Sequence, residues 1–253
     1  MYYNLIKRLC DFTELRVFMK LEETFSEKIF EFDQELGNVR INLPDLYKMI
    51  NPYSGRNKEQ VLQIVKSFYQ KYFNDNNKRR LILGSSPARR GSAITGVPFE
   101  DAQSLQKETG ISIGNFHVSN ASSTFLNRVI DKYGGRTKFY SDFYLNFVCP
   151  LGISKINSKG NSVNCNYYEN KQVENKLLPF IVAALKLQVQ FGIDTSVCYC
   201  IGSGENFQEL NKINKELKLF KKITPLEHPR FITQYHHRDE EEYLDKYLRA
   251  LKS

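Results

Sequence analysis

The chain has 253 residues, of which 41% are hydrophobic, and a formal net charge of +8 at pH 7. This length and hydrophobic content allow a sizeable core, and they exclude a globally disordered chain. A positive excess of this size is compatible with a polyanionic partner such as nucleic acid. The five cysteines include no C-x-x-C pair, which favours reduced thiols over a disulfide framework. No apolar run has membrane-spanning length and the N-terminus lacks a signal-peptide pattern, so we expect a soluble, cytoplasmic protein without a membrane partner.

Apolar residues recur at helical spacing through most of residues 1–80. Phe25, Ile29 and Phe32 form one such stripe, and a longer stripe runs through residues 62–73. A turn at residues 51–55, with the sequence Asn-Pro-Tyr-Ser-Gly, separates the two. We predict that residues 1–80 form an N-terminal helical layer that carries no chemistry of its own.

Four short apolar runs predict the strands of a central sheet: residues 81–83, residues 139–152 (ending in a Pro-Leu-Gly turn), residues 195–201 and residues 222–226. The predicted helices after the first strand are residues 123–133, 175–191, 206–219 and 239–251, and residues 161–170 are interpreted as a polar linker. Because strands alternate with helices, we predict a three-layer α/β/α fold with a four-stranded, mainly parallel sheet. We expect a single domain over residues 1–253, with a core at 81–235 and a C-terminal helix at 236–253.

The loop from Gly84 to Asp101 follows the first predicted strand and is rich in glycine, serine and proline. Such a loop lets the backbone approach a ligand closely while its conformations remain few. It also carries Arg89, Arg90 and Phe99. In open α/β sheets, ligands bind beyond the carboxyl ends of the strands, which is where this loop is expected. The loop is therefore the candidate binding site.

Two further polar positions converge on the same edge of the predicted sheet. Asn146 is an amide inside an apolar strand, and its adjacent donor and acceptor suit the edge of a nucleobase; a hydrogen-bonded structural amide explains it equally well. His228, Pro229 and Arg230 directly follow the fourth predicted strand. An aromatic ring, an amide and a histidine in a basic setting are what a flipped-out base requires.

At these positions the chain resembles the uracil-DNA glycosylase superfamily, in its single-strand-selective monofunctional branch. The resemblance covers residues 81–235. The first motif is carried by Gly84-Ser85-Ser86-Pro87 and Thr95-Gly96-Val97-Pro98-Phe99, the base-reading strand by Asn146 with Cys149-Pro150-Leu151, and the second catalytic motif by His228-Pro229.

The resemblance implies a monofunctional glycosylase of base excision repair, which hydrolyses the N-glycosidic bond of uracil or another deaminated base flipped out of DNA. No metal or cofactor is implied, and a monomer is expected. Phe99 would stack on the base, Asn146 would bond its Watson–Crick edge, and His228 would stabilise charge on a carbonyl oxygen. Further substrate contacts are expected from Gly84, Ser85 and Pro87, and DNA contacts from Arg89, Arg90, Pro229, Arg230, Phe231 and Tyr235.

The chain departs from the branch at several points: Ala88-Arg89-Arg90 follows Pro87 in place of the usual glycine, and the second motif reads His-Pro-Arg in place of His-Pro-Ser. Ser86 stands where the branch usually carries an asparagine that positions the attacking water. Ser86 could hold this water through its hydroxyl, or Glu100 or Asp101 could act as a carboxylate base; we favour Ser86. Asn146 also stands one residue further from Cys149 than expected, a difference that a β-bulge would absorb.

Other classes of protein compete with this interpretation. A non-catalytic nucleic-acid-binding module that retains the glycosylase fold is the main alternative. A nucleotide phosphatase or hydrolase would need a P-loop lysine or an acidic metal cluster. Neither is present in the Gly84 to Asp101 loop, at the end of the Asn146 strand or in the His228-Pro229-Arg230 segment. A purely structural interaction protein leaves the convergence of the three motifs unexplained.

Overall fold

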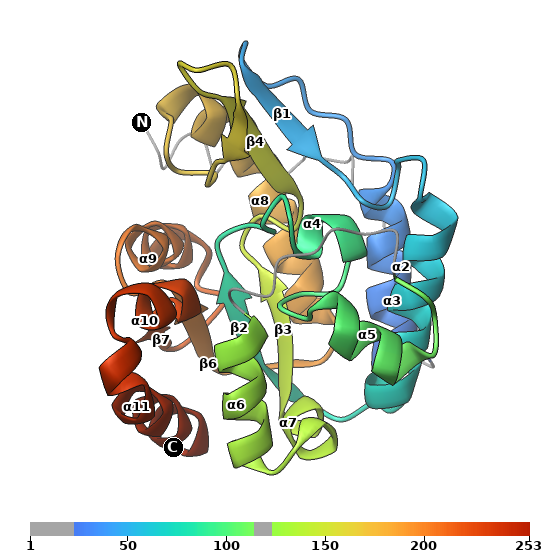
Figure 1. The fold of residues 1–253 in the computed structure, drawn as a ribbon, viewed down its shortest axis with the longest axis vertical. Helices are drawn as coiled ribbons and strands as arrows, with labels where there is room; N and C mark the ends of the chain where they lie inside the picture. The colour runs from blue at the N-terminus through green and yellow to red at the C-terminus, as the bar shows by residue number, and fades with distance from the viewer. Residues whose placement is uncertain (1–22, 114–122) are drawn as a thin grey trace.

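The computed structural model describes residues 23–113 and 123–253, so Cys10 and the first part of the predicted N-terminal layer lie outside the described residues. A four-stranded sheet with the order β3-β2-β6-β7 lies at the centre, and all its neighbouring strands are parallel (Figure 1). Its strands are β2 (Arg79–Gly84), β3 (Phe143–Phe147), β6 (Ile193–Ile201) and β7 (Ile223–Leu226). The predicted fold class is thereby confirmed.

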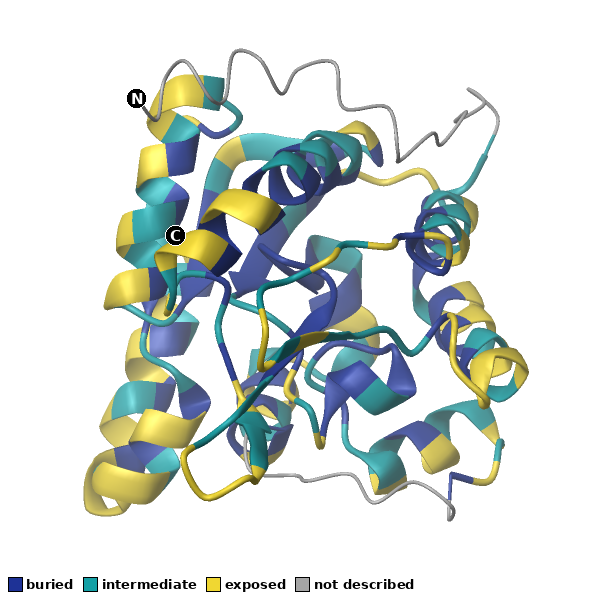
Figure 2. Cartoon of the chain, turned by 90° about the horizontal axis from the view of Figure 1, so that it is seen from above, coloured by how far each residue is buried: buried dark blue, intermediate teal, exposed yellow. Residues whose placement is uncertain are grey.

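Helices surround this sheet. In chain order they are α2 (Phe25–Leu36), α3 (Lys58–Phe73), α4 (Ser92–Thr95), α5 (Ala102–Thr109), α6 (Ser123–Tyr133), α7 (Arg136–Asp142), α8 (Lys171–Gln190), α9 (Glu205–Leu217), α10 (Pro229–Tyr235) and α11 (Glu240–Lys252). A short 3₁₀ turn at His237–Asp239 joins the last two. The exposed residues gather on the outer faces of the helices, while the central strands are buried (Figure 2).

The two faces of the sheet are covered by different helices, as the alternation of side chains along β3 demonstrates. Tyr144 packs its ring edge against Phe25 of α2, with the ring centroids 5.4 Å apart. The preceding residue, Phe143, instead contacts Tyr133 of α6, at 5.3 Å. Successive side chains of a strand point to opposite faces. Each face therefore buries an apolar layer against helices, which is the three-layer arrangement that the sequence predicts.

Helix α2 is an example of local sequence that specifies its own boundary. Thr24 and Glu27 form a capping box, in which the Thr24 N–H donates to Glu27 Oε2 at 2.7 Å. The buried residues Phe25, Ile29 and Phe32 recur at helical spacing and face the core. These are the residues from which a helix is predicted in the N-terminal layer.

A second, antiparallel sheet with the order β1-β4-β5 corrects the prediction for two segments. Strand β1 (Tyr47–Ile50) lies within the layer predicted to be helical, and β5 (Ser162–Asn164) lies within the predicted polar linker. Both pair with β4 (Gly152–Ile156), and Figure 1 shows β1 and β4 above the central sheet. All three strands are short. Strand β1 pairs with β4, about a hundred residues further along the chain, so no local pattern in the sequence reveals the pairing.

Residues 139–142 are a further correction, because they end helix α7 instead of starting a strand. Gly134 and Gly135 adopt positive φ values of 129° and 86°, which glycine tolerates, so the chain turns directly from α6 into α7. Short apolar runs do not distinguish a buried helix from a buried strand.

Within the described residues, no helix is long and apolar enough to cross a membrane.

Candidate functional site: a pocket at the carboxyl end of the central sheet

A cavity of about 730 Å³ lies where strands β2 and β3 end. Its lining includes Gly84 and Phe147, which are the last residues of these two strands. Among the described residues, the lining is formed by residues 84–92, Phe99, Glu100, Ser123, Phe147, residues 163–166, Glu169, His228, Arg230 and Gln234. The pocket therefore brings together the Gly84 loop and the His228 segment, as the sequence predicts.

Two stacked aromatic rings form one wall of the pocket. Phe99 lies on Phe147 with ring centroids 5.0 Å apart and an interplanar angle of 26°. Gly84 makes this stack possible, because a Cβ atom there would lie 2.7 Å from Phe99 Cζ and 2.9 Å from Phe147 Cδ1. Phe99 itself has a φ of 61°, a left-handed conformation that non-glycine residues rarely adopt. Its N–H donates to Ser92 Oγ at 2.9 Å, which helps to hold the strained backbone.

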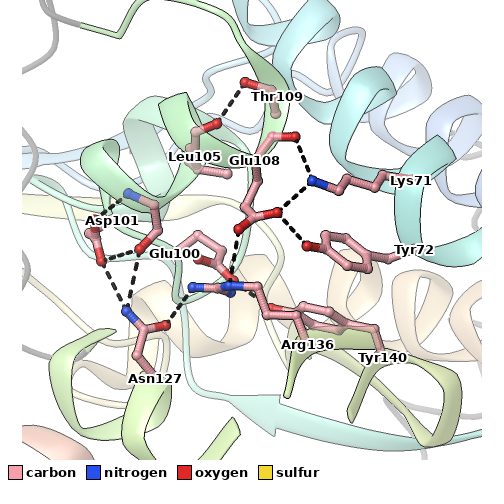
Figure 3. Close-up of polar contacts among 11 residues, drawn as sticks. Lys71, Tyr72, Glu100, Asp101, Leu105, Glu108, Thr109, Asn127, Arg136 and Tyr140 are labelled. Atoms are coloured by element: carbon pink, nitrogen blue, oxygen red, sulfur yellow. Dashed lines mark hydrogen bonds and ion pairs between the residues drawn. The ribbon is translucent and has the colours of Figure 1, made fainter. Parts of the chain in front are cut away.

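Glu100, the residue after Phe99, is buried and tied to a polar network (Figure 3). Its Oε1 accepts a hydrogen bond from the Tyr140 hydroxyl at 2.6 Å and pairs with the Arg136 guanidinium. Among the described residues, Glu100 Oε2 is buried without a hydrogen-bond partner. Burial raises the pKa of Glu100, and the positive charge of Arg136 opposes this rise. Arg136 also donates to Asn127 Oδ1 at 2.9 Å, which connects the pocket wall to α6.

Asp101 has a structural role and does not line the pocket. It is the N-cap of α5, where its Oδ1 accepts the Ser104 N–H at 2.8 Å. Its Oδ2 accepts a hydrogen bond from Asn127 Nδ2 at 3.1 Å. Burial alone would raise the pKa of Asp101, but these hydrogen bonds outweigh it and the pKa is lowered. Of the two carboxylates considered as a base, only Glu100 reaches the pocket.

The loop after β2 places several expected residues in the wall. Ser86 Oγ is buried and has no hydrogen-bond partner within residues 23–113 and 123–253. The Ser85 hydroxyl donates to Asn166 Oδ1 at 2.8 Å, and the Arg89 N–H donates to Asn164 Oδ1 at 2.9 Å. Gly84, Pro87 and Arg90 line the pocket as well. The loop after β2 is thus hydrogen-bonded to Asn164 at the end of β5 and to Asn166 in the segment that follows.

His228 is the N-cap of α10, where a loop was expected from the sequence. Its Nδ1 accepts the Arg230 N–H at 3.1 Å, so the proton of the neutral imidazole is assigned to Nε2. Burial, reinforced by the positive charge of Arg230, lowers the pKa of His228 to about 4. At neutral pH, His228 is therefore an uncharged side chain whose Nε2–H can donate a hydrogen bond.

Helix α10 carries the remaining expected residues. Arg230 lines the pocket, and Pro229 is buried in the first turn of the helix. Phe231 and Tyr235 lie outside the pocket wall and are 40% and 74% exposed. Their rings are 5.9 Å apart, and they form an aromatic patch on the surface of the helix.

Asn146 does not reach the pocket, which corrects its expected position. The pairing of β2 with β3 is continuous from Arg80 with Phe143 to Gly84 with Phe147, so the paired part of β3 contains no bulge. Asn146 therefore shares a face with Tyr144, and its Nδ2 donates to the Tyr144 hydroxyl at 2.7 Å. Its Oδ1 accepts the Phe147 N–H at 2.9 Å. Phe147 lines the pocket in its place.

The residues that the sequence analysis missed come mainly from the segment interpreted as a linker. Asn164, Asn166 and Glu169 line the pocket, as does Gln234 of α10. The only local signal was the alternation Asn164-Cys165-Asn166, in which two amides flank one buried thiol. Nothing local indicates that the second sheet places this alternation against the Gly84 loop.

Comparison with known proteins agrees with this arrangement. The family described as the uracil DNA glycosylase superfamily matches residues 70–252. The chain belongs to this superfamily, and the resemblance stated from its motifs is confirmed.

Among solved structures, the chain is similar to SMUG2 from Pedobacter heparinus, with 40% sequence identity and a TM-score of 0.85. The similarity covers 90% of this chain and 97% of that protein. A search of curated proteins finds no match.

Replacement of Gly84 by alanine is expected to impair the pocket more than the fold. The added Cβ would displace the Phe99 and Phe147 rings, which lie within 2.9 Å of its position. We expect a loss of base release of about tenfold or more, since small misplacements of binding groups cost that much. Gly204→Ala is a matched control, because a Cβ there meets no atom within 4 Å. Equal activity of wild type and Gly84→Ala would contradict the account of this stack.

The His228 imidazole is expected to stay neutral well below the ordinary histidine pKa. Burial lowers its pKa in the folded chain to about 4, whereas an ordinary histidine side chain has a pKa of 6.5. Between these values the unfolded state binds a proton that the folded state does not, so the free energy of unfolding falls as the pH is lowered from 6.5 to 4. NMR titration of the His228 ring measures its pKa directly. A His228 pKa of 6 or above would contradict the burial of the ring.

Proposed function

We propose that this chain is a monofunctional DNA glycosylase that hydrolyses the N-glycosidic bond of uracil, or of another deaminated base, in base excision repair. The observation that carries the proposal is the meeting of Phe99, Ser86 and His228 in one pocket at the carboxyl end of the sheet. The superfamily membership of residues 70–252 supports DNA as the substrate. The residue roles below are part of the proposal.

The base leaves the DNA strand and enters the pocket beside the Phe99 ring. The Phe147 ring covers one face of the Phe99 ring, with the ring centroids 5.0 Å apart, so the base stacks on the other face of Phe99. His228 donates its Nε2–H to a carbonyl oxygen of the base. As the bond between the base and the sugar breaks, negative charge develops on that oxygen, and a preorganised donor stabilises it. The base departs as a stabilised anion, and water adds to C1′ of the sugar. The proton that this water loses neutralises the base anion, and an abasic site remains.

The attacking water is held by Ser86. Its hydroxyl is buried at the pocket wall and, among the described residues, has no partner with which a water would compete. Glu100 is the rival candidate, because its Oε2 is also without a partner in the described part of the chain. Its other oxygen is bound by Arg136 and Tyr140, an arrangement that favours a fixed structural carboxylate. We therefore assign the water to Ser86.

The basic and aromatic residues around the pocket contact the DNA. Arg89, Arg90 and Arg230 line the pocket and would bind phosphates. The exposed rings of Phe231 and Tyr235, presented by the helix that begins at Pro229, would occupy the space that the base vacates. We further propose that the chain acts as a monomer and as a single domain over its 253 residues, in the cytoplasm with the DNA.

Base release from defined oligonucleotides tests the function. Labelled strands that carry uracil, hypoxanthine or xanthine are incubated with the protein and then treated with alkali, which cleaves abasic sites. We expect the uracil strand to break only after alkali, and His228→Ala to slow single-turnover release by about a hundredfold. His237→Ala, at an exposed position outside the pocket, is the matched control.

Two results would contradict this prediction. DNA binding without any alkali-sensitive product would favour the non-catalytic binding module. A His228→Ala rate within a few fold of wild type would remove His228 from the reaction.

Substitutions at Ser86 decide how the water is held. If Ser86 holds it, Ser86→Ala should slow uracil release, because the hydroxyl is lost. Ser86→Asn should accelerate it, because an amide reaches further and is the residue usual in the related branch. Glu100→Gln keeps the shape of the side chain and removes its basicity. Unchanged rates for both Ser86 variants, together with an inactive Glu100→Gln variant, would transfer the water to Glu100.

A further inference from the structure

Asn166 lines the same pocket as Phe99 and His228, but it comes from the segment that connects β5 to α8. Its side chain is held at both ends of the amide. Oδ1 accepts a hydrogen bond from the Ser85 hydroxyl at 2.8 Å, and Nδ2 donates to Glu169 Oε1 at 3.0 Å. The amide is thereby fixed directly against the first motif.

Glu169 determines which way this amide points. The Glu169 carboxylate accepts a hydrogen bond from the backbone N–H of Asn166 at 2.8 Å and one from the Lys155 ammonium at 2.8 Å. Burial alone would raise the pKa of Glu169, but the hydrogen bonds from Lys155 and the Asn166 N–H outweigh it and lower the pKa. An ionised carboxylate can only accept hydrogen bonds. The atom of Asn166 that faces it must therefore be the NH₂ group, and the two ends of the amide are not interchangeable.

The hydrogen-bonding capacity of Asn166 is only half used by these contacts. An amide offers two N–H donors and two acceptor lone pairs. The bonds to Ser85 and Glu169 occupy one of each. Among the described residues, one donor and one acceptor of the amide remain for a ligand. An amide donor and acceptor are together complementary to the O4 acceptor and N3–H donor of uracil. Cytosine presents the opposite pattern, a donor at N4 and an acceptor at N3.

The other three candidate amides, Asn146, Asn164 and Gln234, are less suited to this role. Asn146 does not line the pocket, because it points to the opposite face of β3, where it bonds to the Tyr144 hydroxyl and the Phe147 N–H. Asn164 lines the pocket but is exposed, and its Oδ1 already accepts the Arg89 N–H. Gln234 also lines the pocket and, like Asn164, is exposed. Asn166 is the most buried of these three pocket amides, and both of its polar atoms are held in place.

We propose that Asn166 reads the Watson–Crick edge of the extruded base, the role expected of Asn146 from the sequence. This inference rests on the proposed function, since it names the residue that selects the base in the same pocket. The second sheet then has a functional role, because the segment that leaves its strand β5 carries the amide that β3 does not supply. Ser85 and Glu169 are positioning residues, because they act through the orientation of Asn166.

Asn166→Asp separates reading of the base from packing. Aspartate has the same shape and can still accept from Ser85, but its second oxygen would face the Glu169 carboxylate. Two adjacent carboxylates share a proton between them, which leaves no donor for uracil O4. Asn161→Ala is the control, because Asn161 is an exposed amide in the turn before β5 and does not line the pocket.

Two measurements are made on each protein. One is the single-turnover rate of uracil release. The other is equilibrium binding to strands with 2′-fluoro-2′-deoxyuridine or its cytidine counterpart, in which the fluorine slows cleavage. We expect Asn166→Asp to lower the release rate by about tenfold or more, the effect of one lost hydrogen bond in a desolvated site. It should also abolish the binding preference for uracil over cytosine, whereas Asn161→Ala should preserve both properties.

The outcomes distinguish this inference from the proposed function. Rates and uracil preference that are unchanged in Asn166→Asp, with an active wild type, would overturn the role of Asn166. A wild type that prefers uracil without releasing it, and loses the preference in Asn166→Asp, would support Asn166 and contradict the glycosylase activity. A wild type with neither release nor preference would overturn both. Thermal unfolding of Asn166→Asp confirms that the variant is folded.

Discussion

The parallel pairing of β2 with β3 determines which side chains reach the pocket. The two strands run in continuous register and end together at Gly84 and Phe147. Because side chains alternate along a strand, this register turns Phe147 toward the pocket and Asn146 toward Tyr144. A shift of one residue would exchange the two. The absence of a side chain at Gly84 then leaves room for Phe99 to stack on Phe147.

The stack requires Phe99 to stay in a left-handed conformation, which costs on the order of 1–3 kcal/mol. Two sets of contacts hold Phe99 in this conformation. Ser92 accepts the Phe99 N–H, and the next residue, Glu100, is bound by Arg136 and Tyr140 of α7 (Figure 3). Burial of Glu100 would be costly without these partners. The polar network behind the pocket therefore fixes the aromatic ring on which the base is proposed to stack.

The sequence predicts the central sheet and much of the site because those signals are local. The strand at Leu81, the glycine-rich loop after it and the histidine after β7 are each visible in short segments. Three features depend on distant contacts and are not predictable in this way. Strand β1 pairs with β4 across about a hundred residues, α7 replaces part of a predicted strand, and Asn166 reaches the pocket only through the second sheet. The expected position of Asn146 differs from the observed one, because a shift of one residue along a strand moves a side chain to the other face of the sheet.

The central claim is that this pocket receives a base extruded from DNA. A crystal structure of the chain with a strand that carries 2′-fluoro-2′-deoxyuridine tests it most directly. The account predicts that the uracil ring lies on Phe99, with a carbonyl oxygen within hydrogen-bonding distance of His228 Nε2. A uracil that stays stacked within the strand, or that binds elsewhere while the pocket is vacant, would contradict the account.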